Sequence, residues 1–151
     1  MEKIILDYFS NIFQTNRPTD TFAVVAAIQL IVTNSMNRFL CQPFQADEFH
    51  RALKQMHPKK SPRPDGMAPL FYQHFWTLSS EFVTKAILDF LNFGIIPPKF
   101  NETYVILIPK IKNPTKITDY RPISLSNVIY RLASKVIANR LKCFLPKIIS
   151  C

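Results

Sequence analysis

Apolar residues recur at helical spacing through the first 56 residues, with polar or proline-containing segments between them. The apolar positions of residues 4–12 predict a helix that ends before the turn-forming residues 16–20. A second apolar helix is expected over residues 22–40. Residues 47–56 predict a third, amphipathic helix, because two acidic residues at its start complement the helix dipole and an apolar stripe follows. This stripe consists of Phe49, Ala52, Leu53 and Met56.

A longer helical region is predicted over residues 68–93. We expect a break near Ser79-Ser80, where a serine can cap the second half. Gly94 is suited to end the helix, and Pro97-Pro98 prevents its resumption. The predicted inward stripe of the second half consists of Phe82, Val83, Ala86, Ile87, Phe90 and Leu91.

An aromatic cluster lies in the first half of that region and could serve either base stacking or helix packing. Phe71 and Phe75 are four residues apart, which favours a place in the helix core. Tyr72 and Trp76 share a second face, which we expect to be half exposed.

The last third of the chain predicts two extended segments and a helix. Residues 103–108 are rich in β-branched and aromatic side chains and precede Pro109, a pattern typical of a buried strand. A second extended segment is expected over residues 122–125, and Asn127 is a suitable N-cap for a helix that continues to about Phe144. Its predicted inward residues are Ile129, Leu132, Ala133, Val136 and Ile137, and its predicted outward residues are Arg131, Lys135 and Lys142. The whole pattern indicates a mostly helical α+β fold with one or two short strands.

Composition adds a strong asymmetry of charge to this picture. The chain has 151 residues, enough for one domain, and 48% of them are hydrophobic, enough for a core. Residues 1–98 contain nine Lys and Arg against eight Asp and Glu, a balance of +1, whereas residues 99–151 contain ten against two, a balance of +8. A surface built only for solubility usually mixes both signs, so the basic last third favours a polyanionic partner.

Cysteine and histidine spacing predicts neither a disulfide framework nor a metal site. Cys41, Cys143 and Cys151 form no Cys-x-x-Cys pair, and the three histidines have no metal-ligand spacing. An odd number of cysteines without such pairs is typical of a reducing compartment. No secretory signal is recognisable, and the longest apolar stretch, residues 22–32, is shorter than the roughly 20 residues that span a bilayer. We therefore expect an intracellular protein, nuclear or cytoplasmic, that is not secreted and has no membrane partner.

Several motifs occur in order along the chain: Pro58-Lys59-Lys60-Ser61-Pro62-Arg63-Pro64-Asp65-Gly66-Met67, Leu107-Ile108-Pro109-Lys110, Asp119-Tyr120-Arg121-Pro122-Ile123-Ser124-Leu125, and Ser134-Lys135-Val136-Ile137-Ala138-Asn139-Arg140-Leu141. Together they resemble the front part of the reverse transcriptase domain of plant LINE-type (non-LTR) retrotransposons. The resemblance implies a helical connector over residues 1–45 and a partial reverse transcriptase domain, its fingers, over residues 46–151. In that family the palm follows the fingers, so the resemblance implies a truncated RNA-directed DNA polymerase from which the palm is absent.

The resemblance assigns no catalytic and no metal-binding residue to this chain. In the family the catalytic Mg²⁺ ions are held by palm carboxylates that include an adjacent aspartate pair, and this sequence has no such pair. Asp65 and Asp119 lie in turn-like segments, where aspartate commonly bonds to the backbone. We therefore expect a chain that holds no cofactor and is inactive alone, whereas the complete enzyme would use Mg²⁺.

Lys110 and Arg121 match family positions whose side chains approach the triphosphate of the incoming deoxynucleotide. A guanidinium can hold two phosphate oxygens at once, and an ammonium supplies a mobile point charge. This role requires a complete enzyme. The other interpretation is that both residues are surface cations at the ends of strands.

Lys59, Lys60 and Arg63 lie in a proline-stiffened loop that can present three cations to an RNA or DNA backbone. Arg63 stands where the family usually has glycine. It either strains the loop, if that position needs a positive φ, or merely adds a cation. The alternative function is a non-enzymatic, basic nucleic-acid-binding module that holds RNA weakly through the last third of the chain.

Overall fold

The computed structural model describes residues 2–14, 31–59 and 66–149. Helix α1 (Glu2–Phe13) confirms the first predicted helix. Of the second predicted helix, residues 22–30 lie outside the described residues, and the part that is described forms the shorter α3 (Asn34–Leu40). It begins at Asn34 because the Thr33 hydroxyl accepts a hydrogen bond from the Met36 backbone and so caps the first turn.

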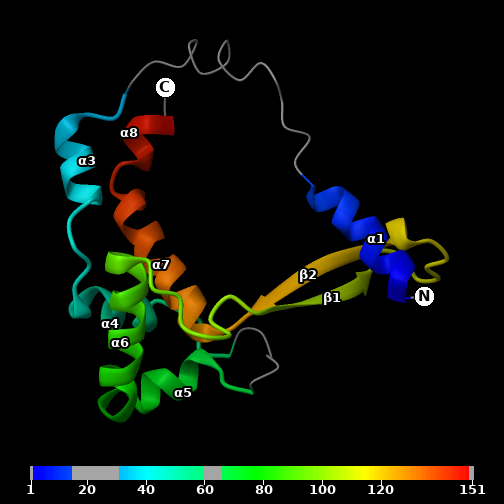
Figure 1. Cartoon of the computed structure of the whole chain (residues 1–151), viewed down its shortest axis with the longest axis horizontal. Helices are drawn as coiled ribbons and strands as arrows, with labels where there is room; N and C mark the ends of the chain where they lie inside the picture. Colours follow the sequence, from blue (N-terminus) through cyan, green and yellow to red (C-terminus); the bar gives the residue numbers. More distant parts are fainter. Residues whose placement is uncertain (1, 15–30, 60–65, 150–151) are drawn as a thin grey trace.

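Four helices pack against one another and form what we call the helical body: α4 (Ala46–Lys54), α5 (Pro69–His74), α6 (Trp76–Phe93) and α7 (Val128–Lys142). Figure 1 shows α7 crossing beside α4 and α6, although the 73 residues 55–127 separate α4 from α7 along the chain. The predicted stripe of α4 is buried as expected. The core consists of Phe49, Ala52, Leu53, Met56, Tyr72, Val83, Ile87, Phe100, Val128, Leu132, Ala133 and Val136.

The predicted break in the region of residues 68–93 lies at Phe75, not near Ser79-Ser80. Phe75 leaves helical geometry, with φ −102° and ψ 28°, and so separates α5 from α6. Ser79 does not cap a helix, because it lies in the first turn of α6 and its hydroxyl donates to the carbonyl of Phe75, the residue that precedes α6.

The aromatic cluster differs from its expected placement at three residues, Phe71, Tyr72 and Phe75. Tyr72 is buried and Trp76 is half-buried, whereas Phe71 and Phe75 are 40% and 43% exposed. Phe71 and Phe75 do share a face, since the Phe75 backbone N–H donates to the Phe71 carbonyl at 2.9 Å and the two ring centroids lie 5.2 Å apart. That face lies at the surface, so the expected place of these two residues in the core is wrong, whereas the half exposure expected of Trp76 is confirmed.

Two further residues of the predicted inward stripes lie at the surface. Phe82 on α6 is 78% exposed, and Ile137 on α7 is 39% exposed, because Val83 and Val136 beside them occupy the faces that meet the core.

The predicted helix ends are confirmed. Gly94 closes α6 in the left-handed conformation with φ 72°. At the start of α7, the side chain of Asn127 accepts from the Tyr130 backbone N–H at 2.7 Å.

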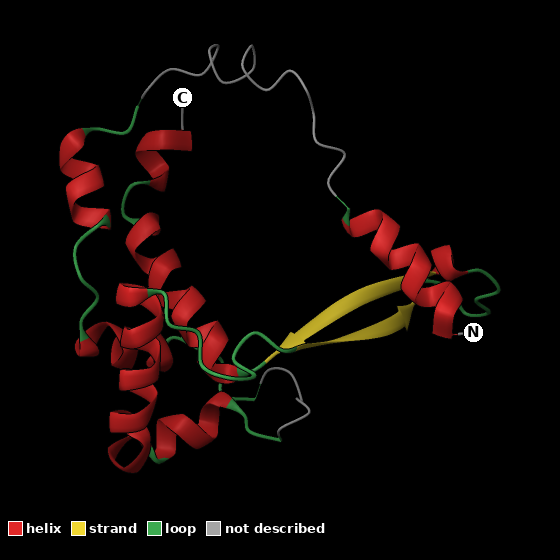
Figure 2. Ribbon diagram, viewed as in Figure 1, coloured by secondary structure: helices red, strands yellow, loops and turns green. Residues whose placement is uncertain are grey.

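The strands form an antiparallel hairpin of β1 (Thr103–Pro109) and β2 (Tyr120–Ser126), with Ile106 opposite Ile123. A short 3₁₀ helix, η1 (Ile117–Asp119), closes the turn between them. The expected burial of β1 is wrong: nearly all of its residues are exposed, since the hairpin projects from the helical body (Figures 1 and 2) and no third strand covers it among the described residues. The last element of the described residues is the short helix α8 (Leu145–Ile149).

The mostly helical α+β class predicted from the sequence is confirmed. Among the helices that the structure describes, none has the length and apolar character needed to cross a bilayer.

Candidate nucleic-acid interface

Lys110 and Arg121 come together at the end of the hairpin that lies farthest from the helical body. Arg121 on β2 is opposite Ile108 on β1, and the Lys110 backbone N–H donates to the Asp119 carbonyl at 2.7 Å. This bond continues the strand register by one more pair. Since side chains two residues apart share a face of a strand, Lys110 and Arg121 project from the same face as diagonal neighbours.

The turn between the strands adds two cations that the sequence interpretation did not single out. Lys112 and Lys116 are exposed, as are Lys110 and Arg121. We call residues 110–121 the hairpin end. It carries four cations and one acidic residue, Asp119. The clustering of lysines between two predicted strands was the available signal for this feature.

Asp119 is engaged by the turn itself. Its carboxylate accepts backbone N–H groups from Lys116 at 2.9 Å and from Thr115 at 3.0 Å, as predicted for an aspartate that serves the backbone. The Lys116 N–H, followed by the Thr115 N–H, holds the pKa of Asp119 below its ordinary value. The Lys110 ammonium donates to the Thr118 carbonyl at 2.7 Å, so one of its three protons also fixes the turn.

The loop proposed to contact a nucleic-acid backbone is described only at its two ends. Lys59 is exposed, and its backbone N–H donates to the His57 ring at 3.3 Å. Gly66 has a positive φ of 68°, in agreement with the predicted turn at Asp65-Gly66. Lys60 and Arg63 lie outside the described residues, so the structural effect of Arg63 stays a prediction.

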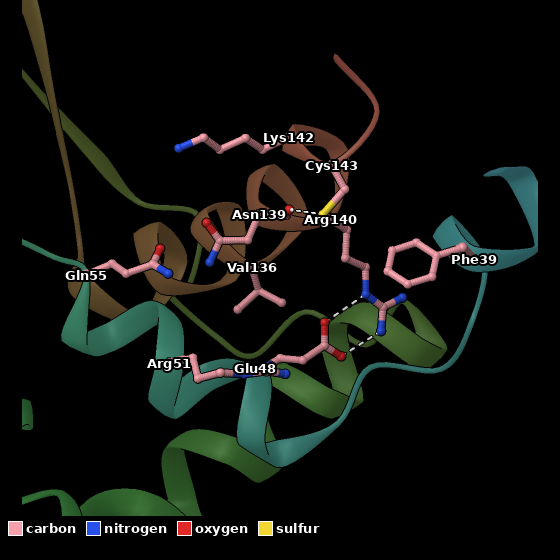
Figure 3. A pocket seen from close by; sticks show the side chains of 9 residues that line it. All are labelled: Phe39, Glu48, Arg51, Gln55, Val136, Asn139, Arg140, Lys142 and Cys143. Atoms are coloured by element: carbon pink, nitrogen blue, oxygen red, sulfur yellow. Dashed lines mark hydrogen bonds and ion pairs between the residues drawn. The ribbon is translucent and has the colours of Figure 1, made fainter. Parts of the chain in front are cut away.

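One cation of the basic last third is not available to a partner. Arg140 on α7 is only 8% exposed, and it lines a surface cleft of about 420 Å³ together with Glu48 at the start of α4 (Figure 3). Its guanidinium donates to both carboxylate oxygens of Glu48, at 2.6 and 2.8 Å, which lowers the pKa of that carboxyl. The positive charge of Arg140 is therefore neutralised by Glu48 inside the protein.

The same guanidinium also holds the segment that enters α4. It donates to the carbonyls of Leu40, Gln42 and Pro43, and it stacks on the Phe44 ring 3.7 Å from the centroid. We call Arg140, Glu48 and these contacts the α4–α7 clamp. Sequence reasoning missed it, although Arg140 continues the spacing of four from Leu132 and Val136, which form the buried stripe of α7.

Within the described ranges 2–14, 31–59 and 66–149, no group of three or more His, Cys, Asp or Glu residues could hold a metal ion.

No protein-family profile matches the chain. Among curated proteins, it is 32% identical over 120 residues to the transposon TX1 uncharacterized 149 kDa protein of Xenopus laevis. The match covers 79% of this chain and 9% of that protein, so the chain spans less than a tenth of its relative's length. The similarity links the chain to a transposon protein.

Proposed function

We propose that the chain forms the connector and fingers of a LINE-type (non-LTR) retrotransposon reverse transcriptase, with the boundary near residue 46. The similarity to a transposon protein over 79% of the chain supports this assignment, as does the order of the motifs. The observation that carries it is the pairing of Lys110 and Arg121 on one face of an exposed hairpin. Such a protein would act inside the cell, in the nucleus or cytoplasm.

In this proposal the hairpin end meets the triphosphate of an incoming deoxynucleotide within the complete polymerase. Arg121 offers a planar fork that can hold two phosphate oxygens, while Lys110 offers the donors that Thr118 does not use. Phosphoryl transfer in such an enzyme uses Mg²⁺ held by palm carboxylates, and we assign no residue of this chain to that step. The contribution of these residues is to orient and neutralise the nucleotide.

The hairpin end, together with Lys59, Lys60 and Arg63, would also hold the RNA or DNA backbone. No contact of this kind depends on base identity, so binding should be weak, indifferent to sequence and dependent on salt. Each phosphate neutralised on a single strand contributes about −0.7 to the slope of log affinity against log salt concentration. Four to six contacts would therefore give a slope of about −3 to −4.

The test is a fluorescence-anisotropy titration of a short labelled RNA at several salt concentrations. Lys110→Ala combined with Arg121→Ala should reduce the magnitude of the slope by about 1.4, because two contacts are lost. The matched control is Arg51→Ala combined with Lys54→Ala. It removes the same charge from the exposed side of α4 and should change the slope little. Salt-independent affinity, or equal effects of both double variants, would contradict the proposed surface.

The second candidate function is a non-enzymatic, basic nucleic-acid-binding module. It is favoured by the charge balance of +8 over residues 99–151. Titration with thymidine 5′-triphosphate, followed through backbone amide NMR signals, distinguishes the two. Saturable shifts around Lys110 and Arg121 that the double variant loses would favour the fingers. Shifts spread over all exposed cations and removed by moderate salt would favour the module.

A further inference from the structure

The outer edge of β1 presents backbone groups that no described strand pairs with. The hydrogen bond from Lys110 to Asp119 marks their pair as a bonded one, and bonded and non-bonded pairs alternate along an antiparallel ladder. Ile108, Ile106 and Tyr104 therefore point their backbone groups toward β2. The backbone groups of Thr103, Val105 and Leu107 point away from it.

Prolines protect the two edges of the hairpin unequally. Pro122 lies in the middle of β2, opposite Leu107, where an outward N–H would otherwise be. On β1, Pro109 likewise lies where an outward N–H would otherwise be, but it is the last residue of that strand. A proline within an edge strand interrupts pairing with another chain. The edge of β2 is therefore interrupted, and the edge of β1 is open from Thr103 to Leu107.

The side chains along this open edge are uncharged and, apart from Thr103 and the Tyr104 hydroxyl, apolar, and charged residues flank them at both ends. Tyr104, Val105, Ile106 and Ile108 are each 44–57% exposed, and no charged residue lies between Glu102 and Lys110. Uncharged strands of high β propensity with an open edge readily pair with a further strand. The opposite charges at the two ends suit an antiparallel partner of the same sequence.

We propose that two copies of the chain pair through the open edges of β1, antiparallel and about a two-fold axis at Ile106. In this register Ile106 lies opposite its own counterpart, Val105 opposite Leu107, and Tyr104 opposite Ile108. At the two ends of the strand, Thr103 of one copy lies opposite Pro109 of the other, so every residue of β1 has a counterpart. The result is a four-stranded antiparallel sheet, which is more stable than an isolated two-stranded hairpin.

Charge selects this register over its neighbours. Glu102 of each copy lies opposite Lys110 of the other, on the same sheet face, which gives two symmetry-related ion pairs. The Lys110 ammonium has donors beyond the one that bonds to Thr118. A shift of one bonded pair in one direction would place Glu102 opposite Ile108. The opposite shift would place it opposite Lys112, which lies beyond the end of the strand.

The register is tested by cross-linking in a background in which Cys41, Cys143 and Cys151 are replaced by serine. Opposed residues of a non-bonded antiparallel pair have Cα atoms about 4.5 Å apart, within reach of a disulfide. Ile106→Cys should therefore form a cross-linked dimer under mild oxidation. The matched control is Ile108→Cys. It lies on the same face with nearly equal exposure, 44% against 46%, but about 14 Å from its counterpart in this register.

Cross-linking of Ile106→Cys that is at least about tenfold faster than that of Ile108→Cys, and that is lost in denaturant, supports the proposal. Equal rates for the two variants would overturn it, since non-specific aggregation treats both positions alike. A strictly monomeric wild-type chain in sedimentation equilibrium would overturn it as well.

Charge reversal gives an independent test that leaves the apolar strand intact. Glu102→Lys or Lys110→Glu alone places like charges opposite each other twice and should weaken dimerisation about tenfold at low salt. The double reversal, Glu102→Lys with Lys110→Glu, restores opposite charges and should return the dissociation constant to near the wild-type value. A double variant that dimerises no better than either single variant would overturn the register.

Discussion

Replacing Arg140 with alanine should destabilise the helical body far more than any change to an exposed ion pair. The residue is 8% exposed, and its guanidinium donates to both Glu48 oxygens and to the backbone carbonyls of Leu40, Gln42 and Pro43. Its removal leaves the half-buried Glu48 carboxylate without its main partner, although the Gln45 backbone N–H still donates to it. Breaking a buried pair from one side typically costs about 3–5 kcal/mol. This is a large fraction of the roughly 5–15 kcal/mol that stabilises a small domain.

The assay is urea unfolding of wild type and variants, followed by far-UV circular dichroism. The chain provides a matched control on α4. Arg51 also pairs with a carboxylate, that of Asp47 at 2.7 Å, but both side chains are more than two-thirds exposed. Arg51→Ala should cost no more than about 0.5 kcal/mol, the usual value for an exposed pair of this spacing.

The reasoning is refuted if Arg140→Ala and Arg51→Ala lower the free energy of unfolding by similar amounts. A third variant distinguishes the loss of the attraction between Arg140 and Glu48 from the cost of leaving the Glu48 charge unpaired. Arg140→Met combined with Glu48→Leu removes both charges and should be less destabilised than the sum of the two single changes. Strict additivity would mean that the guanidinium acts only through the carbonyls and the Phe44 ring.

Two smaller predictions concern Glu48 and Asn127. Arg140 lowers the folded-state pKa of Glu48 below its ordinary value of 4.5, so its contribution to stability is complete above that value and is lost as the pH falls through the folded-state pKa. Glu48→Gln should be less stable than wild type at pH 7 and should lose less stability on acidification, as measured by urea midpoints from pH 7 to 3. The pKa of Asp119 is also lowered in the folded state, so Asp119 should preserve part of the acid sensitivity in Glu48→Gln. Asn127→Ala removes the N-cap of α7 and should cost about 0.5–2 kcal/mol, whereas Asn127→Asp should retain most of the stability in thermal melts.

Local signals in the sequence predicted the elements of this fold well. The acidic start and apolar stripe of α4, the Asn127 cap and the Gly94 end all depend on residues within one or two turns of one another. Such signals act through the backbone of the element itself, so they can be recognised without knowing what the element packs against.

What the sequence did not predict depends on contacts between distant segments. The exposure of β1 follows from the absence of a covering layer in the described chain, which a run of apolar residues cannot reveal. Phe82 was assigned to the wrong face because its stripe was drawn one residue too wide. The α4–α7 clamp joins residues 92 positions apart, and no local signal in the sequence assigned Arg140 to this contact. At the candidate site, the sequence identified Lys110 and Arg121, but only the strand register places them on one face.

The dimer edge and the hairpin end share Lys110, so self-association and nucleic-acid binding cannot be independent. In the paired sheet, each Lys110 gains the carboxylate of Glu102 from the second copy as a neighbour, and this neutralises one of the four cations of the hairpin end. A phosphate backbone would meet a weaker positive potential there, and each partner must lower the affinity for the other by the same factor. The RNA dissociation constant should therefore rise as the protein concentration passes through the dimerisation range. In Lys110→Glu, which dimerises poorly, it should instead be independent of protein concentration. An RNA affinity that is unchanged across the dimerisation range of the wild type would show that the two surfaces are separate.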